Sequence, residues 1–535
     1  MYSDNDYILL LISKFLKRVN RPFKKKELTV ALLSHPFYPA ISSISQTLTY
    51  LGINNKVYRA DYTGVLKANS PALAHLKDNR FILLLKADTS QTTYYDAVTN
   101  KYITGPAEDF RNRWSGYILY ITEQSPKTAY PSRFRFHIPH LYLFCYLLIV
   151  GSSIILYVLF PVNGISLLLL KMSGFIVCLG FISHYLSPGS ATTYSLCKTS
   201  SVFDCDRVLQ SPASRLMGKI PLSAVGLAYF CMGILALING YLAHCATTIT
   251  TLLYYISVTG LPFILFSFIY QGTILKKWCP LCLATCSIIL IENILFYFYP
   301  IKTVFSNNLF SSVLILAFSG ITAAGIATLI EIYAQAKQKS KHDNIEFLKL
   351  KRNPAIAYTS FQQQPCLNTQ TFSDMLIGEK NAPHTLITVL NPSCKPCRKA
   401  ANDIIHLLET YPGKVKWLIR FDGTDKPENS PVNSIQLHLL ELYQKINDSS
   451  KFLSVLKAWF THPLPDFFTR HYPVPEISPD TITRLKAHIS RNQKDKIEKI
   501  PYIAIGKRVL PVTYTINDLA YFFPEEEFLK KITDE

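Results

Sequence analysis

A long, nearly uncharged block in the middle of the chain constrains the fold more than any other feature. Between Pro139 and Ala334 only twelve residues are Asp, Glu, Lys or Arg. Six apolar runs follow one another there, each about 20 residues or longer, which is enough to cross roughly 30 Å of hydrocarbon as a helix. They cover 139–160, 164–186, 220–243, 248–272, 280–299 and 309–334. We therefore predict a helical membrane region of six spans between two soluble flanks.

An even number of spans places both flanks on the same side of the membrane. The loop 187–219 and the segment around Cys279 fall on that side too. Basic residues near these loops favour the cytoplasm for that side, while the opposite loops carry only Lys302. Those residues are Lys198, Arg207, Arg215, Lys219, Lys276 and Lys277. Stable disulfide chemistry belongs outside the cytoplasm, so we expect the extracytoplasmic side instead.

The net charge of +19 is spread over the whole chain. A basic surface beside apolar spans fits contact with anionic lipid. The chain shows no zinc-finger or RNA-binding pattern, so we expect the lipid bilayer as a partner and no nucleic acid. The start of the chain does not resemble a signal peptide, because Tyr7 to Ile12 is short and no small-residue cleavage site follows.

Three pairs of cysteines carry the chemistry: Cys279 with Cys282, Cys394 with Cys397, and Cys197 with Cys205. The first two have C-x-x-C spacing, and paired thiols of this kind exchange electrons as dithiol and disulfide. Two alternatives stand beside this interpretation, a zinc site and small buried residues packing between helices. We expect no metal. The other cysteines are interpreted as packing residues, except for Cys366, which stays unassigned. The packing set is Cys145, Cys178, Cys231, Cys245 and Cys286.

The C-terminal flank, 343–535, has the pattern of a thioredoxin-like α/β domain. A strand over 385–390 leads into Cys394, a helix and a second strand over 415–421 follow, and a helical insertion precedes a late strand at 501–506. A thiolate at Cys394 would be stabilised by the helix N-terminus and would be a good leaving group, with Cys397 as the resolving thiol. The resemblance to the thioredoxin fold implies that Pro501 is a cis-proline that holds the substrate peptide.

The region 164–300 closely resembles bacterial vitamin K epoxide reductase homologues, many of which carry a fused thioredoxin-like domain. The resemblance rests on Cys197, on 200–209 with Cys205, on Ser211 and on 278–282. It implies a four-helix bundle around a quinone, either menaquinone or ubiquinone. By position, Cys279 and Cys282 become the quinone-proximal pair, Cys197 and Cys205 the loop shuttle, and Ser211 a hydrogen-bond partner of the quinone. Vertebrate members have a tyrosine where this chain has Cys286, so their inhibitor and substrate preferences do not transfer.

The site is also chemically reasonable without the family. A quinone is apolar and lives in the bilayer, and a dithiol at the end of a span can reduce it. Glu292 lies within a span, where an acid is a functional candidate by default. Two roles stay open for Glu292, accepting a quinone-linked proton or pairing with a neighbouring helix.

The N-terminal flank, 1–125, mixes helical spacing at 28–33 and 41–51 with strands at 81–85 and 116–121. Through the segments 35–39, 71–75, 80–84, 94–96 and 114–116, it resembles the bacteriocin-processing, papain-like peptidase domain. Such a peptidase needs a cysteine nucleophile and a histidine base. No cysteine precedes Cys145, and Arg80 stands where the family has its histidine, so that Asp96 alone matches. We predict an α+β domain that is catalytically dead and retains peptide binding or docking, or serves as a structural cap.

The predicted architecture is a multi-domain protein with a helical membrane bundle between these two domains. A linker covers 126–138, an extra span 139–160, the redox bundle 164–300 and a connecting span 309–334. The predicted function is a membrane thiol oxidoreductase that passes electrons from reduced exported proteins or peptides to the membrane quinone pool, supporting disulfide formation. The alternatives are the same relay run as a reductase, or a peptide-binding or transport protein with structural cysteines.

Overall fold

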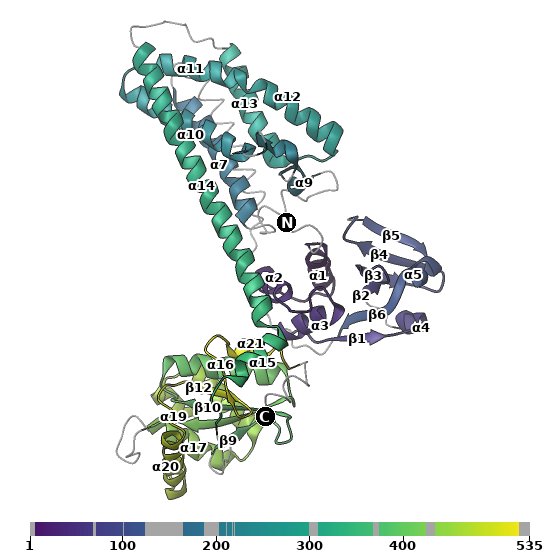
Figure 1. The fold of residues 1–535 in the computed structure, drawn as a ribbon, viewed down its shortest axis with the longest axis vertical. Coiled ribbons are helices and arrows are strands. Elements are labelled where there is room, and N and C mark those ends of the chain that lie inside the picture. Colours follow the sequence, from purple (N-terminus) through teal and green to yellow (C-terminus); the bar gives the residue numbers. More distant parts are fainter. Residues whose placement is uncertain are drawn as a thin grey trace. The chain divides into compact units, whose positions relative to one another are not determined.

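The computed structural model describes residues 6–67, 71–99, 101–122, 164–186, 203–209, 211–216, 218, 220–298, 309–367, 374–423 and 434–523. These residues form two compact units (Figure 1). One unit combines the N-terminal and C-terminal soluble regions, residues 1–130 and 344–535. The other holds residues 131–343. The predicted linker 126–138, the predicted span 139–160 and Cys197 lie outside the described residues.

The N-terminal region is an α+β domain built on one antiparallel sheet. The sheet has six strands in the order β1-β6-β2-β3-β4-β5. The strands are β1 (Asn55–Arg59), β2 (Ala72–Leu76), β3 (Phe81–Ala87), β4 (Gln91–Asp96), β5 (Lys101–Pro106) and β6 (Trp114–Ile121). The helices are α1 (Asp6–Arg18), α2 (Lys25–Leu33), α3 (Ile41–Tyr50), α4 (Tyr62–Lys67) and α5 (Ala107–Arg113). The predicted helices and strands of this flank are therefore present.

The sheet of this domain carries a separate hydrophobic core on each face. Leu11 and Phe15 of α1 pack with Leu73 and Leu83 of the central strands. Ile82, between two residues of the first core, faces Trp114 and other residues in the second core. This alternation follows from the two-residue period of a strand, and it explains why these strands are apolar without interruption.

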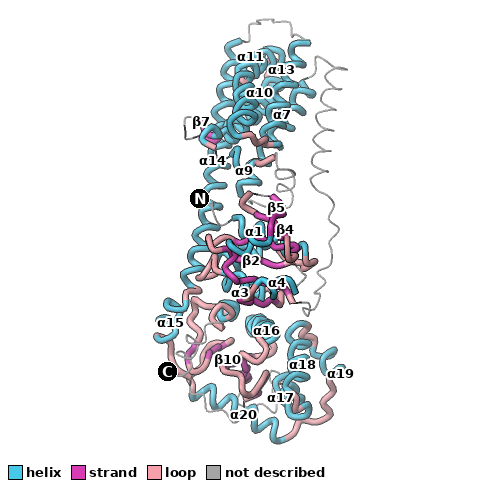
Figure 2. The backbone as a smooth tube through the Cα atoms, turned by 90° about the vertical axis from the view of Figure 1, so that its right-hand side faces the viewer, coloured by secondary structure: helices cyan, strands magenta, loops and turns pink. Residues whose placement is uncertain are grey.

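The middle unit is helical throughout most of its described length, as the cyan tube in Figure 2 shows. Among the described residues, five helical segments are long and apolar enough to cross a membrane. They are α7 (Gly164–Leu186), α10 (Leu222–Leu242), the run α11 (Ala246–Thr259), α12 (Leu261–Ile269) and η2 (Tyr270–Leu275), then α13 (Pro280–Phe298) and α14 (Leu309–Lys351). Helices α7, α10, α11 and α13 contact one another as a bundle.

Two of these segments contain the predicted spans 248–272 and 309–334 but differ from them in detail. The run predicted as one span at 248–272 is divided at Gly260, because Pro262 cannot continue the helical hydrogen bonding of α11. Helix α14 continues past 334, and it also crosses the predicted domain start at 343. The polar stretch after Ala334 contains good helix formers, and no proline interrupts it before Pro354.

The C-terminal region is an α/β domain with a five-stranded sheet in the order β13-β12-β10-β11-β9. The strands are β9 (Met375–Ile377), β10 (His384–Leu390), β11 (Val415–Phe421), β12 (Tyr502–Ile505) and β13 (Arg508–Val509). Strands β10 and β11 are parallel, while β12 and β9 run antiparallel to them. The helices are α15 (Pro354–Gln362), α16 (Lys395–Thr410), α17 (Ser434–Ile446), α18 (Ser449–Thr461), α19 (Pro465–His471), α20 (Pro479–Lys494) and α21 (Ile516–Leu519).

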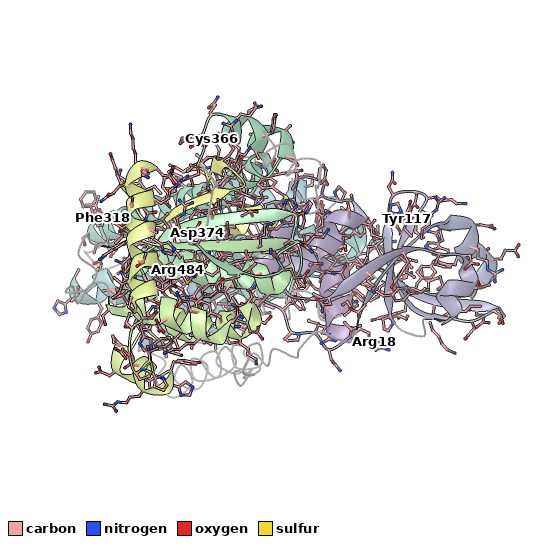
Figure 3. All side chains as sticks on the ribbon, turned by 90° about the horizontal axis from the view of Figure 1, so that it is seen from below. Arg18, Tyr117, Phe318, Cys366, Asp374 and Arg484 are labelled. Carbon is pink, nitrogen blue, oxygen red and sulfur yellow. The ribbon has the colours of Figure 1, made fainter. Side chains whose placement is uncertain are left out.

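A buried ion-pair network fixes one side of this sheet. The Arg420 side chain on β11 is fully buried and donates to Asp374 at 2.9 Å and to Asp495 at 2.8 Å. Asp374 is labelled on the C-terminal domain in Figure 3. Burial, the largest effect, raises the pKa of Asp374 even though the Arg420 guanidinium opposes it. The network ties α20 and the segment before β9 to the central strands.

Candidate redox site

The first thiol pair, Cys394 and Cys397, lies at the beginning of helix α16, just after strand β10. Cys394 is the N-cap residue of α16, and Pro396 lies in its first turn. A tight turn precedes the helix, because the Cys394 amide donates to the Asn391 carbonyl at 3.0 Å and the Ser393 amide donates to the Asn391 side chain at 2.9 Å. Proline suits the first turn of a helix, where the missing N–H costs nothing. The thiol of Cys394 is thus held at the positive end of the helix.

The two thiols of this pair have different surroundings. Cys394 is half-buried, whereas Cys397 is buried completely in the core of the domain. Burial raises the pKa of the Cys397 thiol to about 12, so this sulphur stays protonated at neutral pH. An outer sulphur that meets a partner and an inner sulphur that resolves the mixed disulfide are what thiol–disulfide exchange requires.

Pro501 lies at the same end of the sheet as this thiol pair. The register of β10 and β12 pairs Leu386 with Ile505 and Val389 with Tyr502. Pro501 therefore lies opposite the end of β10, immediately before the turn to Cys394. The Ile500–Pro501 peptide bond is cis.

Sequence reasoning did not identify Trp459 as part of this site. Its indole N–H donates to the carbonyl oxygen of Pro392 at 3.1 Å, in the turn that carries Cys394. Trp459 is buried and its ring packs edge-on against Phe468 of α19 at 5.1 Å. The helical insertion is thereby anchored to the thiol-bearing turn. A lone tryptophan in a helical insertion gave no sequence signal that distinguishes this role from core packing.

The second thiol pair opens helix α13 in the middle unit. The chain turns back at Lys276, whose φ is +51°, and Trp278 then forms a bridge with Phe203. The Cys282 amide points at the Cys279 sulphur at 3.3 Å. A backbone donor therefore already faces the sulphur of Cys279 at the beginning of a helix, where negative charge is favoured.

Gln271 positions this pair, and the sequence analysis missed it. Its side-chain oxygen accepts from the Cys279 amide at 2.8 Å, and its backbone oxygen accepts from the Lys277 amide at 3.1 Å. Its side-chain nitrogen donates to Ser267 at 2.8 Å. Gln271 is almost fully buried. A glutamine within an otherwise apolar run is the one sequence signal that could have drawn attention to it.

The third pair is described in part. Cys205 begins the short helix α9 (Cys205–Leu209) and is disulfide-bonded. Its predicted partner, Cys197, lies outside the described residues. Cys205 and Cys279 are both completely buried and belong to one hydrophobic cluster with Phe181 and Val208. The Asp204 amide donates to the Trp278 carbonyl at 3.0 Å, which fixes the loop beside the second pair.

Ser211 follows α9 and is buried. Its hydroxyl donates to the Val208 carbonyl at 2.7 Å. The structure brings Ser211 near the cluster that holds Cys205, through Val208. To donate to a ligand, this hydroxyl must turn away from Val208.

A polar network links the four helices of the bundle. Lys171 of α7 and Glu292 of α13 form a fully buried ion pair at 2.7 Å. The Tyr229 hydroxyl of α10 donates to Glu292 at 3.0 Å. On the next residue, the Asn293 side chain donates to Ser257 of α11 at 2.8 Å. Of the two roles considered for Glu292, the observed contact is with a neighbouring helix.

The N-terminal domain contains no thiol. Arg80 and Asp96 lie 3.9 Å apart, and Arg80 also pairs with Asp78 at 2.6 Å. Tyr7, on the first turn of α1, interacts with the charges of Arg80 and Asp96. Burial, the largest effect, raises the pKa of Tyr7. A positive guanidinium thus occupies the place predicted for a general base.

Of the remaining thiols, Cys178 and Cys286 lie close enough to Cys282 to interact with it electrostatically. Cys366 is exposed at the surface of the C-terminal domain, where Figure 3 labels it. Cys178, Cys231 and Cys245 are buried in the bundle region. Among the residues that the structure describes, no group of three or more His, Cys, Asp or Glu side chains could hold a metal ion.

Three segments of the chain match family models. Residues 16–126 match the peptidase C39 family, residues 165–297 match the vitamin K epoxide reductase family, and residues 370–520 match a thioredoxin family. The three families occur in the order expected from the sequence. A comparison with curated proteins finds no match.

Several solved structures are similar to part of the chain. The catalytic domain of Proteus mirabilis ScsC is 16% identical and covers 34% of this chain and 99% of its own, with a TM-score of 0.25. Oxidised BdbD from Bacillus subtilis is 17% identical and covers 32% and 98%, with a TM-score of 0.24. A periplasmic thioredoxin-like protein from Salmonella enterica serovar Typhimurium is 14% identical and covers 31% and 94%, with a TM-score of 0.25.

Proposed function

We propose that this membrane thiol–disulfide oxidoreductase, which joins a C39-peptidase-like domain, a vitamin K epoxide reductase bundle and a thioredoxin-like domain, is a quinone-linked thiol oxidase. Two thiols of an exported protein or peptide reduce the Cys394–Cys397 disulfide. That dithiol reduces Cys197–Cys205, which in turn reduces Cys279–Cys282. Each exchange moves two electrons and two protons, and the last dithiol gives both to a quinone, which leaves as the quinol.

The observation that carries the proposal is the shared burial of Cys205 and Cys279 in one cluster. Thiol–disulfide exchange needs direct contact between sulphurs of successive pairs. The hydrogen bond between Asp204 and Trp278 holds the two segments together. This arrangement supports electron transfer from the loop pair to the pair at the start of α13.

The surroundings of Cys282 fit a quinone. Val177, Phe181 and Leu281 pack in the same cluster and offer the apolar surface that a flat ring needs. Ser211 is the proposed hydrogen-bond partner for a quinone carbonyl, once its hydroxyl turns from Val208. When bound, the quinone supplies a two-electron acceptor. Menaquinone and ubiquinone both fit this chemistry.

The thioredoxin-like pair is the proposed entry point for electrons. Cys394 is accessible enough to meet a substrate thiol, and Cys397 is buried behind it. Pro501, at the same end of the sheet, is the proposed contact for the substrate backbone. We propose that this domain faces the extracytoplasmic side of the inner membrane, because disulfides persist there.

The experiment is quinone reduction by purified protein with a reduced peptide as the electron donor. Cys282→Ala should abolish the reaction, and Cys366→Ala should leave it unchanged, since Cys366 is exposed and outside the pairs. Peptide oxidation that survives Cys282→Ala would refute the relay. Absence of thiol-dependent quinone reduction in the unmodified protein would favour a peptide-binding or transport protein with structural cysteines.

The direction of electron flow needs a separate measurement. We expect Cys394 and Cys397 to accumulate as the dithiol in cells whose respiration is blocked. Trapping free thiols with a mass-tagged maleimide reports this state. An unchanged redox state under the block would count against an oxidase and favour the same relay run as a reductase.

The N-terminal domain is proposed to be inactive as a peptidase. It has no cysteine nucleophile, and Arg80 cannot act as a general base because its guanidinium stays protonated. Purified protein should therefore leave leader peptides uncleaved.

A further inference from the structure

Arg352 is a buried contact point between three segments that lie far apart in the sequence. It follows the last residue of α14 and is nearly enclosed, with 9% of its side chain exposed. Its guanidinium donates to Ser34, at the end of α2 in the peptidase-like domain. It also donates to Asp518 of α21, in the thioredoxin-like domain, at 3.3 Å. We call Ser34, Arg352, Asp518 and Tyr521 the Arg352 node.

Arg352, Ser34 and Asp518 each have a charged or hydrogen-bonded partner, and Tyr521 contributes the face of its ring. The Arg352 guanidinium lies 3.9 Å from the centre of the Tyr521 ring, a cation–π distance. Asp518 accepts from Lys351 at 2.6 Å and from the Thr515 amide at 2.9 Å. Burial alone would raise the pKa of Asp518, but the donors outweigh it and leave the pKa below its usual value. An exposed ion pair contributes little to stability, whereas a buried arginine with this many partners holds the segments around it in one arrangement.

Aromatic and imidazole rings extend the contact around the node. The rings of His35 and Tyr50, both from the peptidase-like domain, lie 5.5 Å and 5.4 Å from the Tyr521 ring. Tyr50 also packs against the hydrophobic core of the thioredoxin-like domain. His35 stays uncharged beside Arg352, because burial lowers its pKa to about 4. A neutral ring there avoids repulsion with the guanidinium.

The contact lies away from the redox thiols. Helix α21 packs on α16, and Tyr411, just past the end of α16, donates to the Ala520 carbonyl at 3.3 Å. Cys394 caps the opposite end of this helix, whose 16 residues span about 24 Å. Around Cys394, the side chains of Ser393, Lys395 and Pro396 are exposed. The contact therefore leaves the thiol pair open.

We infer that the peptidase-like domain serves as an intramolecular dock for the thioredoxin-like domain. It holds that domain through the Arg352 node, at the end of α16 remote from Cys394, so that the two domains form one body whose thiols remain accessible. This inference does not rest on the proposed electron relay. It assigns the inactive domain a partner within its own chain.

The test is hydrogen–deuterium exchange, read by mass spectrometry, on the full chain in detergent or nanodiscs. Arg352→Met should speed exchange about tenfold or more in two separated segments together, 34–50 and 514–523, because opening the dock exposes both. Lys339→Met removes a charge from an exposed position of α14 and should change neither segment. Faster exchange in one segment alone after Arg352→Met would overturn the dock.

Faster exchange in β10 and β11 would reveal that Arg352→Met unfolds the C-terminal domain. A second variant keeps the inference testable in that case. Tyr50→Ala changes only the peptidase-like domain, yet it should speed exchange across the interface at 514–523. An effect confined to the segment around Tyr50 would refute the inference. Exchange does not depend on thiol chemistry, so failure of the dock and failure of the relay are separate results.

Discussion

The ion pair between Lys171 and Glu292 allows a quantitative prediction. Both side chains have no exposed surface, their charged atoms lie 2.7 Å apart, and Tyr229 adds a hydrogen bond to the same carboxylate. Glu292→Leu leaves the Lys171 ammonium buried with the rings of Tyr229, 3.8 Å away, and Phe230, 5.9 Å away, as cation–π contacts. A cation–π contact recovers about 0.5–2 kcal/mol, less than the loss. We expect either single change, Glu292→Leu or Lys171→Met, to destabilise the bundle by about 3–5 kcal/mol.

The double variant distinguishes pairing from packing. Removing both charges at once also removes the penalty of an unpaired buried charge, so Lys171→Met with Glu292→Leu should lie within about 1–2 kcal/mol of the wild type. Unfolding free energies measured in bicelles, by a double-mutant cycle, give the coupling directly. Glu331→Leu is the matched control, because this acid lies in an apolar helix but makes an exposed hydrogen bond to Gln335. A loss in the double variant equal to the sum of the two single losses would refute the reasoning, since the charges would then act independently.

Three further predictions concern single side chains. Gln271→Leu removes the acceptor for the Cys279 amide and should slow quinone reduction about tenfold, while the free energy of unfolding changes by no more than roughly 1–2 kcal/mol. Gln271→Glu retains an acceptor and should recover most of the rate. Equal rates of quinone reduction for both variants would contradict the positioning role. Burial raises the pKa of Cys397 to about 12, so the protonated thiol should stabilise the reduced thioredoxin-like domain fully below pH 9. This contribution should be lost progressively as pH rises toward 12, because the unfolded chain releases the proton more readily. Melting curves under reducing conditions should show no such loss in Cys397→Ala. Burial lowers the pKa of His35 to about 4, so the contribution of its neutral ring to the free energy of unfolding should be fully present above pH 6.5. That contribution should fall by up to about 3 kcal/mol between pH 6.5 and 4, because the unfolded chain then binds a proton more readily than the folded one. The same acid dependence in a His35→Gln variant would rule out this histidine as the cause.

Much of the fold could be predicted because its signals are local. The strand predicted at 415–421 has the same bounds as β11, and the strand–CxxC–helix pattern placed Cys394 at the start of α16. Periodicity and spacing are properties of neighbouring residues, so one sequence is enough to display them. The continuation of α14 beyond the predicted span also has a local cause, since the polar stretch after Ala334 contains good helix formers and no proline before Pro354.

The contacts that complete the sites could not be predicted in this way. Lys171 and Glu292 are separated by 121 positions, and Ser34 and Arg352 by 318. The residues near Lys171 in the sequence do not indicate that its partner lies on another helix. Trp459 likewise acts through Pro392, which is 67 positions away and is brought close only by the fold. Such residues look like ordinary helix residues until the tertiary structure shows what they touch.

The complete burial of Cys205 and Cys279 has a consequence for selectivity. Small water-soluble thiols, such as those that fill a cell, have no surface at which to reach these two sulphurs. Half-buried Cys394 is open to them and to protein substrates alike. In the proposed relay, this enclosure would keep bystander thiols from exchanging with these two sulphurs, while Cys394 stays open to them.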